Sequence, residues 1–157
     1  MKSLVVYYSR SGNTRFVAEY ISQEIAADIE EIIDKKKRKG LFCFILSGYD
    51  ATRGRLTEIA EMERSPKDYD LIIVGTPMWN KRIVPAVRTY LKENSFSGKN
   101  VALFCTNLGS QSNQVFSTLK ELIPGCVFVG ELTISNVKKQ IEENKEKISE
   151  WTKSLIV

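Results

Sequence analysis

Residues 5–21 read "VVYYSRSGNTRFVAEYI", and this stretch decides the fold class. It begins in a short run of Val and Tyr, which is typical of a strand buried on both faces. Apolar residues with helical spacing begin at Val17, after a cluster of small hydroxyl, Gly and amide residues. A hairpin turn would need fewer residues and would lead to another strand. The direct change from strand to helix therefore predicts the first half of a βαβ unit.

The same alternation continues along the whole chain. Strand-like runs follow at residues 28–33, 69–75, 99–106 and 126–134, and helical spacing recurs at residues 85–92, 115–123 and 137–155. Strands that alternate with helices pair in parallel and have their helices on both faces of the sheet. We predict a doubly wound α/β fold, with residues 1–157 forming a single domain.

The composition limits the possible chemistry. Apolar residues make up 43% and charged residues 27% of the 157 residues, and no apolar run is long enough to span a bilayer. The chain has three cysteines, Cys43, Cys105 and Cys126, and no C-x-x-C pair, so we expect reduced thiols in a cytoplasmic protein without a signal peptide. It has no histidine, which excludes Ser-His-Asp catalysis and His-ligated metals. We predict no metal site, and chemistry that depends on a bound cofactor.

Much of the net charge of +4 lies in the basic run at residues 35–39. Such a run is found in nucleic-acid or anionic-membrane patches, and also in solvated loops. No aromatic residues interleave with the basic ones and no nucleic-acid-binding motif accompanies them. We therefore expect a solvated loop and no nucleic-acid partner.

The small residues after the first strand form a candidate anion site. Parallel sheets bind ligands at the carboxyl ends of their strands, and the first turn of the following helix has unpaired amides at its positive end. Gly12 allows a sharp turn, and the neighbouring hydroxyl and amide side chains are hydrogen-bond donors. The alternative is that one of them only caps the helix. The candidate phosphate-binding residues are Ser9, Arg10, Ser11, Gly12, Asn13 and Thr14.

Several classes of phosphate-binding protein are excluded because their sequence motifs are absent from this chain. The chain has neither G-x-x-x-x-G-K-[ST] nor G-x-G-x-x-G, so NTPase and dinucleotide fingerprints are absent. No cysteine is followed by Arg at the spacing of a Cys-dependent phosphatase, and no acidic pair of a receiver domain follows the first strand. The ligand that remains possible is a bound phosphomonoester, held by the dipole at the start of the helix and by hydroxyl groups.

Two further segments are expected at the same edge of the sheet. In "LIIVGTPMWNKRIVPAVRTYL" (residues 71–91), Trp79 follows the third strand in a predicted loop, where its ring offers a surface for stacking; the alternative is a core Trp. The fourth strand ends in "CTNLGSQS" (residues 105–112), which is again small and polar.

These motifs resemble the flavodoxin family. "SRSGNT" (residues 9–14) is similar to its S-x-[ST]-G-N-T phosphate loop, and residues 75–91 resemble its flavin-ring loop and following helix. "SGYDATRGRL" (residues 47–56) is similar to a subgroup of short bacterial flavodoxin-like oxidoreductases. The resemblance covers essentially the whole chain. It implies a flavodoxin-like five-stranded parallel sheet of order 2-1-3-4-5 and an FMN cofactor.

The resemblance also implies a role for each segment. Ser9 through Thr14 would bind the FMN phosphate, and Trp79 would stack on the isoalloxazine ring. The residues bordering the ring would be Thr76, Pro77, Met78, Trp79 and Asn80. Backbone donors to its pyrimidine edge would come from Thr106, Asn107, Leu108, Gly109 and Ser110. Residues 41–46, which are apolar, would pack on the sheet in a helix, cover the open flavin face or form a subunit contact.

Two features depart from electron-carrier flavodoxins. The loop at residues 106–110 has no second aromatic residue, and the chain is net basic where these carriers are acidic. We predict an FMN-binding redox protein whose partner is another redox protein or a small-molecule electron acceptor. The alternatives are an NAD(P)H-dependent quinone or nitro-compound reductase and a flavin-free binding module.

Overall fold

The computed structural model describes residues 1–36, 49–50 and 52–156. Its sheet has five parallel strands in the order β2-β1-β3-β5-β6. Their bounds are β1 (Ser3–Tyr7), β2 (Asp28–Glu31), β3 (Leu71–Trp79), β5 (Asn100–Asn107) and β6 (Val127–Ser135). A short sixth strand, β4 (Arg82–Ile83), pairs with β3 in antiparallel orientation. When the parallel strands are numbered along the chain without β4, their order in the sheet is 2-1-3-4-5. The predicted doubly wound fold is therefore confirmed.

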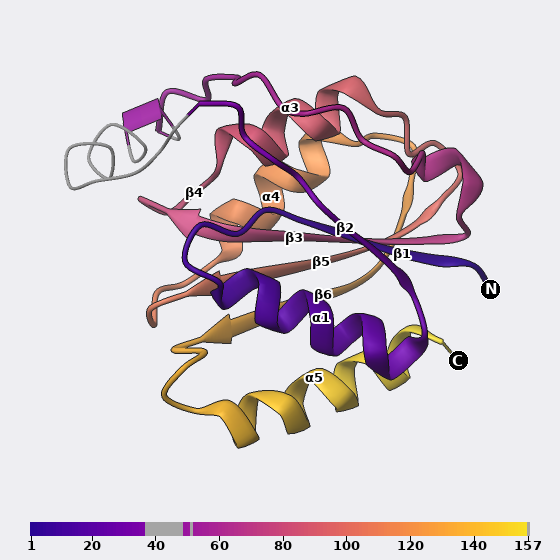
Figure 1. Ribbon diagram of the computed structural model, residues 1–157, viewed down its shortest axis with the longest axis vertical. Helices are drawn as coiled ribbons and strands as arrows, with labels where there is room; N and C mark the ends of the chain where they lie inside the picture. The colour runs from indigo at the N-terminus through magenta and orange to yellow at the C-terminus, as the bar shows by residue number, and fades with distance from the viewer. Residues whose placement is uncertain (37–48, 51, 157) are drawn as a thin grey trace.

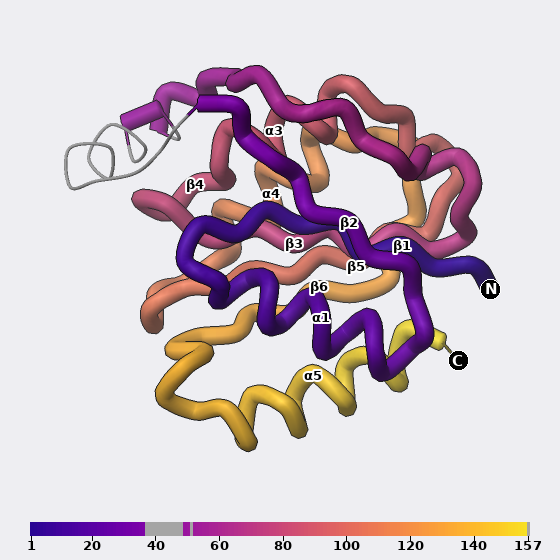
Figure 2. Tube along the Cα trace, in the orientation of Figure 1, coloured from indigo at the N-terminus to yellow at the C-terminus, as the bar shows by residue number. Residues whose placement is uncertain are grey.

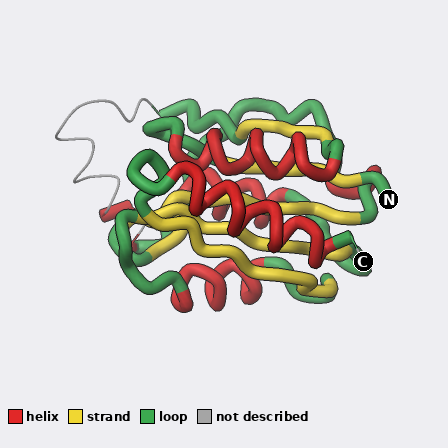
Figure 3. The backbone as a smooth tube through the Cα atoms, turned by 90° about the horizontal axis from the view of Figure 1, so that it is seen from below, coloured by secondary structure: helices red, strands yellow, loops and turns green. Residues whose placement is uncertain are grey.

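Helices cover both faces of this sheet (Figure 1). Helices α1 (Asn13–Ile25) and α5 (Ile141–Leu155) lie on one face, and α3 (Pro85–Glu93) and α4 (Asn113–Leu122) lie on the other. They run alongside the strands (Figure 3), and one short 3-10 helix, η1 (Pro66–Asp68), precedes β3. In the described part of the chain, no helix has both the length and the apolar character needed to span a membrane.

The strands at the centre of the sheet divide the core into two apolar clusters. Every residue of β1 is buried, and its side chains alternate: Leu4 and Val6 belong to one cluster, Val5 and Tyr7 to the other. This alternation follows from the two-residue period of a strand. A continuous apolar run therefore fits a strand with helices on both faces, as the sequence predicted.

The end of β3 differs from the prediction. Residues 76–79 were expected in a loop, but β3 continues through Trp79, which pairs with Arg82 across a two-residue turn. The turn residues Asn80 and Lys81 have φ angles of 49° and 59°. Positive φ at both central residues gives a tight hairpin whose twist suits the flanking strands, and Asn tolerates this conformation better than most residues.

The carboxyl ends of the parallel strands meet at the edge of the sheet opposite to the two termini (Figures 1 and 2). The segment after β1, the β3–β4 hairpin and the segment after β5 all lie at this edge. The predictions for residues 37–48, including the apolar residues 41–46 and most of the basic run, lie outside the described residues.

Candidate functional site

The segment between β1 and α1 forms the first wall of the site. Gly12, the N-cap residue of α1, has a φ of 87°, and its N–H donates to Ser9 Oγ over 3.2 Å. A Cβ atom added to Gly12 would have no neighbour within 4 Å. Glycine is therefore needed here for its backbone angle, because there is room for a side chain but the left-handed conformation strains other residues.

The amino end of α1 has neither a capping side chain nor an acidic residue in its first turn, although Ser, Asn and Thr surround it. The alternative that these residues only cap the helix is therefore not what the structure shows. The carbonyl oxygen of the Asn13 side chain is also buried without a hydrogen-bond partner. Rotating this amide by half a turn would present its NH2 group at the same place. Unpaired helix amides beside an unpaired side-chain amide form a site suited to an anion.

Thr14 connects this loop to β5. Its Oγ1 lies 2.8 Å from Oγ1 of Thr106, and both residues are buried. Only one hydroxyl hydrogen is used in this bond, so one remains for another acceptor. The next residue, Arg15, pairs with Glu31 over 2.6 Å. This hydrogen bond raises the pKa of the Arg15 guanidinium.

Asn107 holds the loop after β5 in shape. Its Oδ1 accepts from the Gly109 N–H over 2.8 Å and from Ser135 Oγ over 2.7 Å. Its Nδ2 donates to the Ser110 carbonyl over 2.8 Å. The predicted role of residues 106–110 was to supply backbone donors, but the Gly109 N–H already has this partner. Leu108, at the tip of the loop, is 83% exposed.

The Trp79 side chain, at the end of β3, contacts both aromatic and cationic neighbours. The Tyr8 ring meets it edge-on, with centroids 5.7 Å apart and an angle of 84° between the rings. The Arg10 guanidinium carbon lies 5.0 Å from the Trp79 ring centroid. Trp79 is half-buried, and it packs against a core cluster and also lines a cleft. It is therefore not only a core residue, and its stacking on a ring stays a prediction.

These segments enclose a cleft of about 150 Å³. Its lining residues come from all three predicted segments: Arg10, Ser11, Asn13, Thr14, Pro77, Met78, Trp79, Thr106, Asn107 and Leu108. The topology thus brings together residues that lie far apart in the sequence.

The other predicted residues lie at the margins of this cleft. Gly12 lines an adjacent cavity of about 290 Å³ together with Lys138 and Ile141 near the start of α5. Ser110 lines a third cavity, of about 400 Å³, together with Lys81. The Thr76 side chain donates to the Pro77 carbonyl over 2.9 Å, and Asn80 donates to Thr52 Oγ1 over 2.7 Å.

Sequence reasoning missed Tyr8 and the contribution of α5. Tyr8 was taken as part of a buried strand, and its contact with Trp79 depends on β1 and β3 being neighbours. Lys138 and Ile141 lie more than a hundred positions from the first loop, so no local pattern connects them to it.

Comparison with known proteins identifies the family. A family model described as "Flavodoxin" matches residues 49–155, which is more than half of the chain. The chain belongs to the flavodoxin family. No curated protein sequence matches it significantly.

Solved structures of flavodoxins and flavoproteins share the fold. A flavoprotein from Lactobacillus acidophilus NCFM, solved in complex with FMN, is 24% identical with a TM-score of 0.74, and the alignment covers 90% of this chain and 97% of that one. Oxidised flavodoxin 2 from Bacillus cereus is 21% identical with a TM-score of 0.65, over 99% of this chain and 97% of that one. At these identities the likeness concerns the fold alone.

Proposed function

We propose that this flavodoxin-family protein binds FMN in the cleft between β1, β3 and β5 and transfers electrons through it. The observation that carries the proposal is the amino end of α1. There, a helix start without a capping side chain and the Asn13 side chain, whose carbonyl oxygen has no partner, border the same cleft as Trp79. Gly12, in left-handed conformation, lines the adjacent cavity. A phosphate beside an aromatic surface fits this set of donors.

Each segment would bind a different part of the cofactor. Residues 9–14 would hold the phosphate through backbone amides and the hydroxyl of Ser11, which is exposed. The half-buried Trp79 would contact the isoalloxazine ring, and residues 106–110 would border its polar edge. The flavin would supply the redox chemistry, while the protein positions it and controls its surroundings. The FMN complex of the Lactobacillus flavoprotein supports the choice of cofactor.

A second candidate function is an NAD(P)H-dependent quinone or nitro-compound reductase. The observation that favours it is the basic character of the segment that contains β3, the hairpin and α3: residues 71–92 contain Lys81, Arg82, Arg88 and Lys92 and no Asp or Glu. The remaining alternative is a flavin-free binding module, which would have neither of these two redox functions.

Titration with flavins tests the proposal. We expect the purified protein to bind FMN and to show flavin absorption, and Ser11→Ala to weaken FMN binding about tenfold, because hydrogen bonds to charged groups contribute roughly 1.5–3 kcal/mol. Riboflavin lacks the phosphate and should bind parent and variant alike. Ser154→Ala, which removes an exposed hydroxyl at the end of α5, is the matched control. A protein that binds no FMN would leave only the binding module.

Steady-state turnover separates the two redox functions. A reductase would oxidise NADPH or NADH at a rate that depends on an added quinone. A pure electron carrier would accept electrons from a reductase protein but show negligible oxidation of either nucleotide by itself.

A further inference from the structure

The Arg10 side chain lies on the ring side of the candidate flavin cleft, although Arg10 belongs to the loop predicted to bind the phosphate. Its guanidinium carbon is 5.0 Å from the centroid of the Trp79 ring, which is within the range of a cation–π contact. Trp79 also meets the Tyr8 ring edge-on, with 5.7 Å between the centroids. Arg10 therefore reaches the aromatic surface that is proposed to contact the isoalloxazine ring.

Arg10 is also the one charged residue among the described residues that line this cleft. The other lining residues are neutral: Ser11, Asn13, Thr14, Pro77, Met78, Trp79, Thr106, Asn107 and Leu108. The two neighbouring cavities add Lys81 and Lys138 and, within the described parts of the chain, no Asp or Glu. Arg10 is exposed, so a ligand can meet its guanidinium without any rearrangement of the core. A molecule bound in the cleft would thus have positive charge beside it.

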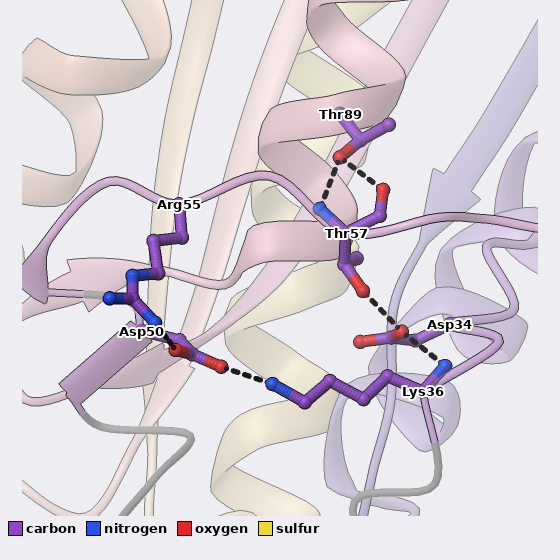
Figure 4. Close-up of polar contacts among 6 residues, drawn as sticks. All are labelled: Asp34, Lys36, Asp50, Arg55, Thr57 and Thr89. Atoms are coloured by element: carbon purple, nitrogen blue, oxygen red, sulfur yellow. Dashed lines mark hydrogen bonds and ion pairs between the residues drawn. The ribbon is translucent and has the colours of Figure 1, made fainter.

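Two carboxylates that flank this end of the sheet are already engaged by cations. Glu31, at the carboxyl end of β2, pairs with Arg15 over 2.6 Å. Asp50 lies in the segment that is hydrogen-bonded to the β3–β4 hairpin. It is only 4% exposed, and its two oxygens accept from Lys36 Nζ over 2.9 Å and from Arg55 over 3.3 Å (Figure 4). These two carboxylates therefore do little to offset the positive charge at the cleft.

Reduction changes the charge of a flavin ring but not that of its phosphate. Two-electron reduction adds two electrons and one proton to the oxidised ring, so that the ring gains one negative charge; the electrons come from the redox partner of the proposed function. A cation beside the ring stabilises the charged form more than the neutral one. Groups that hold the phosphate meet the same charge in both states. A cation at the ring therefore changes the reduction potential, whereas a cation at the phosphate changes mainly the affinity.

We infer that Arg10 acts on the flavin ring and not on the phosphate, and that its charge stabilises the reduced ring and raises the midpoint potential. The contact with Trp79 holds the guanidinium on the ring side, and the neutral lining of the cleft leaves its charge without an opposing carboxylate there. This inference rests on the proposed function and applies to both of its redox forms. It makes Arg10 the residue that favours transfer of electrons to the bound flavin.

An anaerobic redox titration of the FMN-loaded protein against a dye of known potential tests the inference. The parent is compared with Arg10→Gln, which removes the charge, and with Arg10→Lys, which keeps the charge but not the planar guanidinium. The control variant Arg64→Gln removes the same charge near the amino end of β3. The affinities of the FMN-free proteins for oxidised FMN and for riboflavin are measured by calorimetry, and melting temperatures are recorded for all variants.

We expect Arg10→Gln to bind reduced FMN about tenfold more weakly, relative to oxidised FMN, than the parent does. For a two-electron couple this ratio corresponds to a midpoint potential lower by about 30 mV. Arg10→Lys should recover most of this shift, and Arg64→Gln should behave like the parent. Any change in the affinity of Arg10→Gln for oxidised FMN should also be found for riboflavin, which has the ring but no phosphate. Since Arg10 is exposed, the melting temperatures should be alike.

Three results would overturn the inference while leaving FMN binding intact. One is an unchanged midpoint potential in Arg10→Gln. Another is an equal shift in Arg64→Gln, which would show only a general effect of net charge. The third is a loss of affinity confined to FMN and absent for riboflavin, with no change in potential, which would return Arg10 to the phosphate. A parent protein that binds neither FMN nor riboflavin would overturn the proposed function, and this inference with it.

Discussion

Thr14 and Thr106 are 92 positions apart in the sequence, and their hydroxyl oxygens lie 2.8 Å apart in the core of the protein. This hydrogen bond joins the first turn of α1 to the end of β5. Both segments border the cleft, so one contact connects its two walls. A site built from three separate loops needs such cross-connections, because loops are otherwise the most mobile part of a fold.

We expect Thr14→Val to lower the free energy of unfolding by about 1–3 kcal/mol, since it leaves the buried Thr106 hydroxyl without this partner. Urea unfolding of the FMN-free protein measures this loss. Replacing both partners by Val should cost less than the sum of the two single changes, because no unpaired hydroxyl remains. Thr118→Val, which removes a bond to a carbonyl within α4, is the control. Strictly additive losses would show that the two hydroxyl groups do not interact.

Gly12→Ala is expected to weaken FMN binding and to lower stability by about 1 kcal/mol, because Ala is strained at a φ of 87°. The matched control is Gly98→Ala. Gly98 has a φ of 73°, and a Cβ atom added to it would also have no neighbour within 4 Å. It lies between α3 and β5, at the other edge of the sheet. Both variants should lose similar stability by urea unfolding, and only Gly12→Ala should lose affinity in an FMN titration. An equal effect of both on FMN binding would argue that the angle at Gly12 has no special role.

The sequence predicted those parts of the fold and site that depend on local patterns. Apolar runs predicted four of the five parallel strands, and the alternating pattern at residues 28–33 predicted β2. The small residues between Tyr8 and Arg15 predicted the loop at the start of α1. The two-residue strand β4 has no periodicity to detect, and its turn lacks the Asn-Gly pair typical of such hairpins. The hydrogen bonds of Asn107 and the burial of Arg88 depend on contacts between distant segments, which a pattern along the chain does not contain.

Trp79→Ala is expected to weaken FMN binding and to increase the fluorescence of the flavin that remains bound, because an aromatic ring in contact with a flavin quenches its emission. The aromatic contact should contribute about 0.5–1.5 kcal/mol beyond area burial. Since Trp79 also packs against the core and against Tyr8, the variant should lose stability as well. Trp79→Phe keeps most of both contacts and should show a smaller change in each measurement. Trp151, on α5, is half-buried on the opposite face, and Trp151→Phe should leave flavin emission unchanged.

The pH dependence of stability tests the environment of Cys105, a fully buried residue of β5. Burial raises the pKa of its thiol to about 12 from an ordinary value of 9.0. Between these two values the unfolded chain has lost the thiol proton and the folded chain keeps it. The folded state therefore binds more protons, and its stability must fall as the pH rises through this range, by up to about 1.4 kcal/mol per pH unit.

Burial also raises the pKa of Tyr90, which adds to the decline above pH 10. We expect the free energy of unfolding, measured with urea at several pH values, to decline steadily from about pH 9 upward. Cys105→Ala removes one titrating group, so its decline should be shallower than that of the parent, even though the smaller side chain lowers stability at every pH. Cys126 is only half-buried, and Cys126→Ala should change the slope less. If the Cys105→Ala protein declines as steeply as the parent, the thiol of Cys105 titrates alike in the folded and unfolded states.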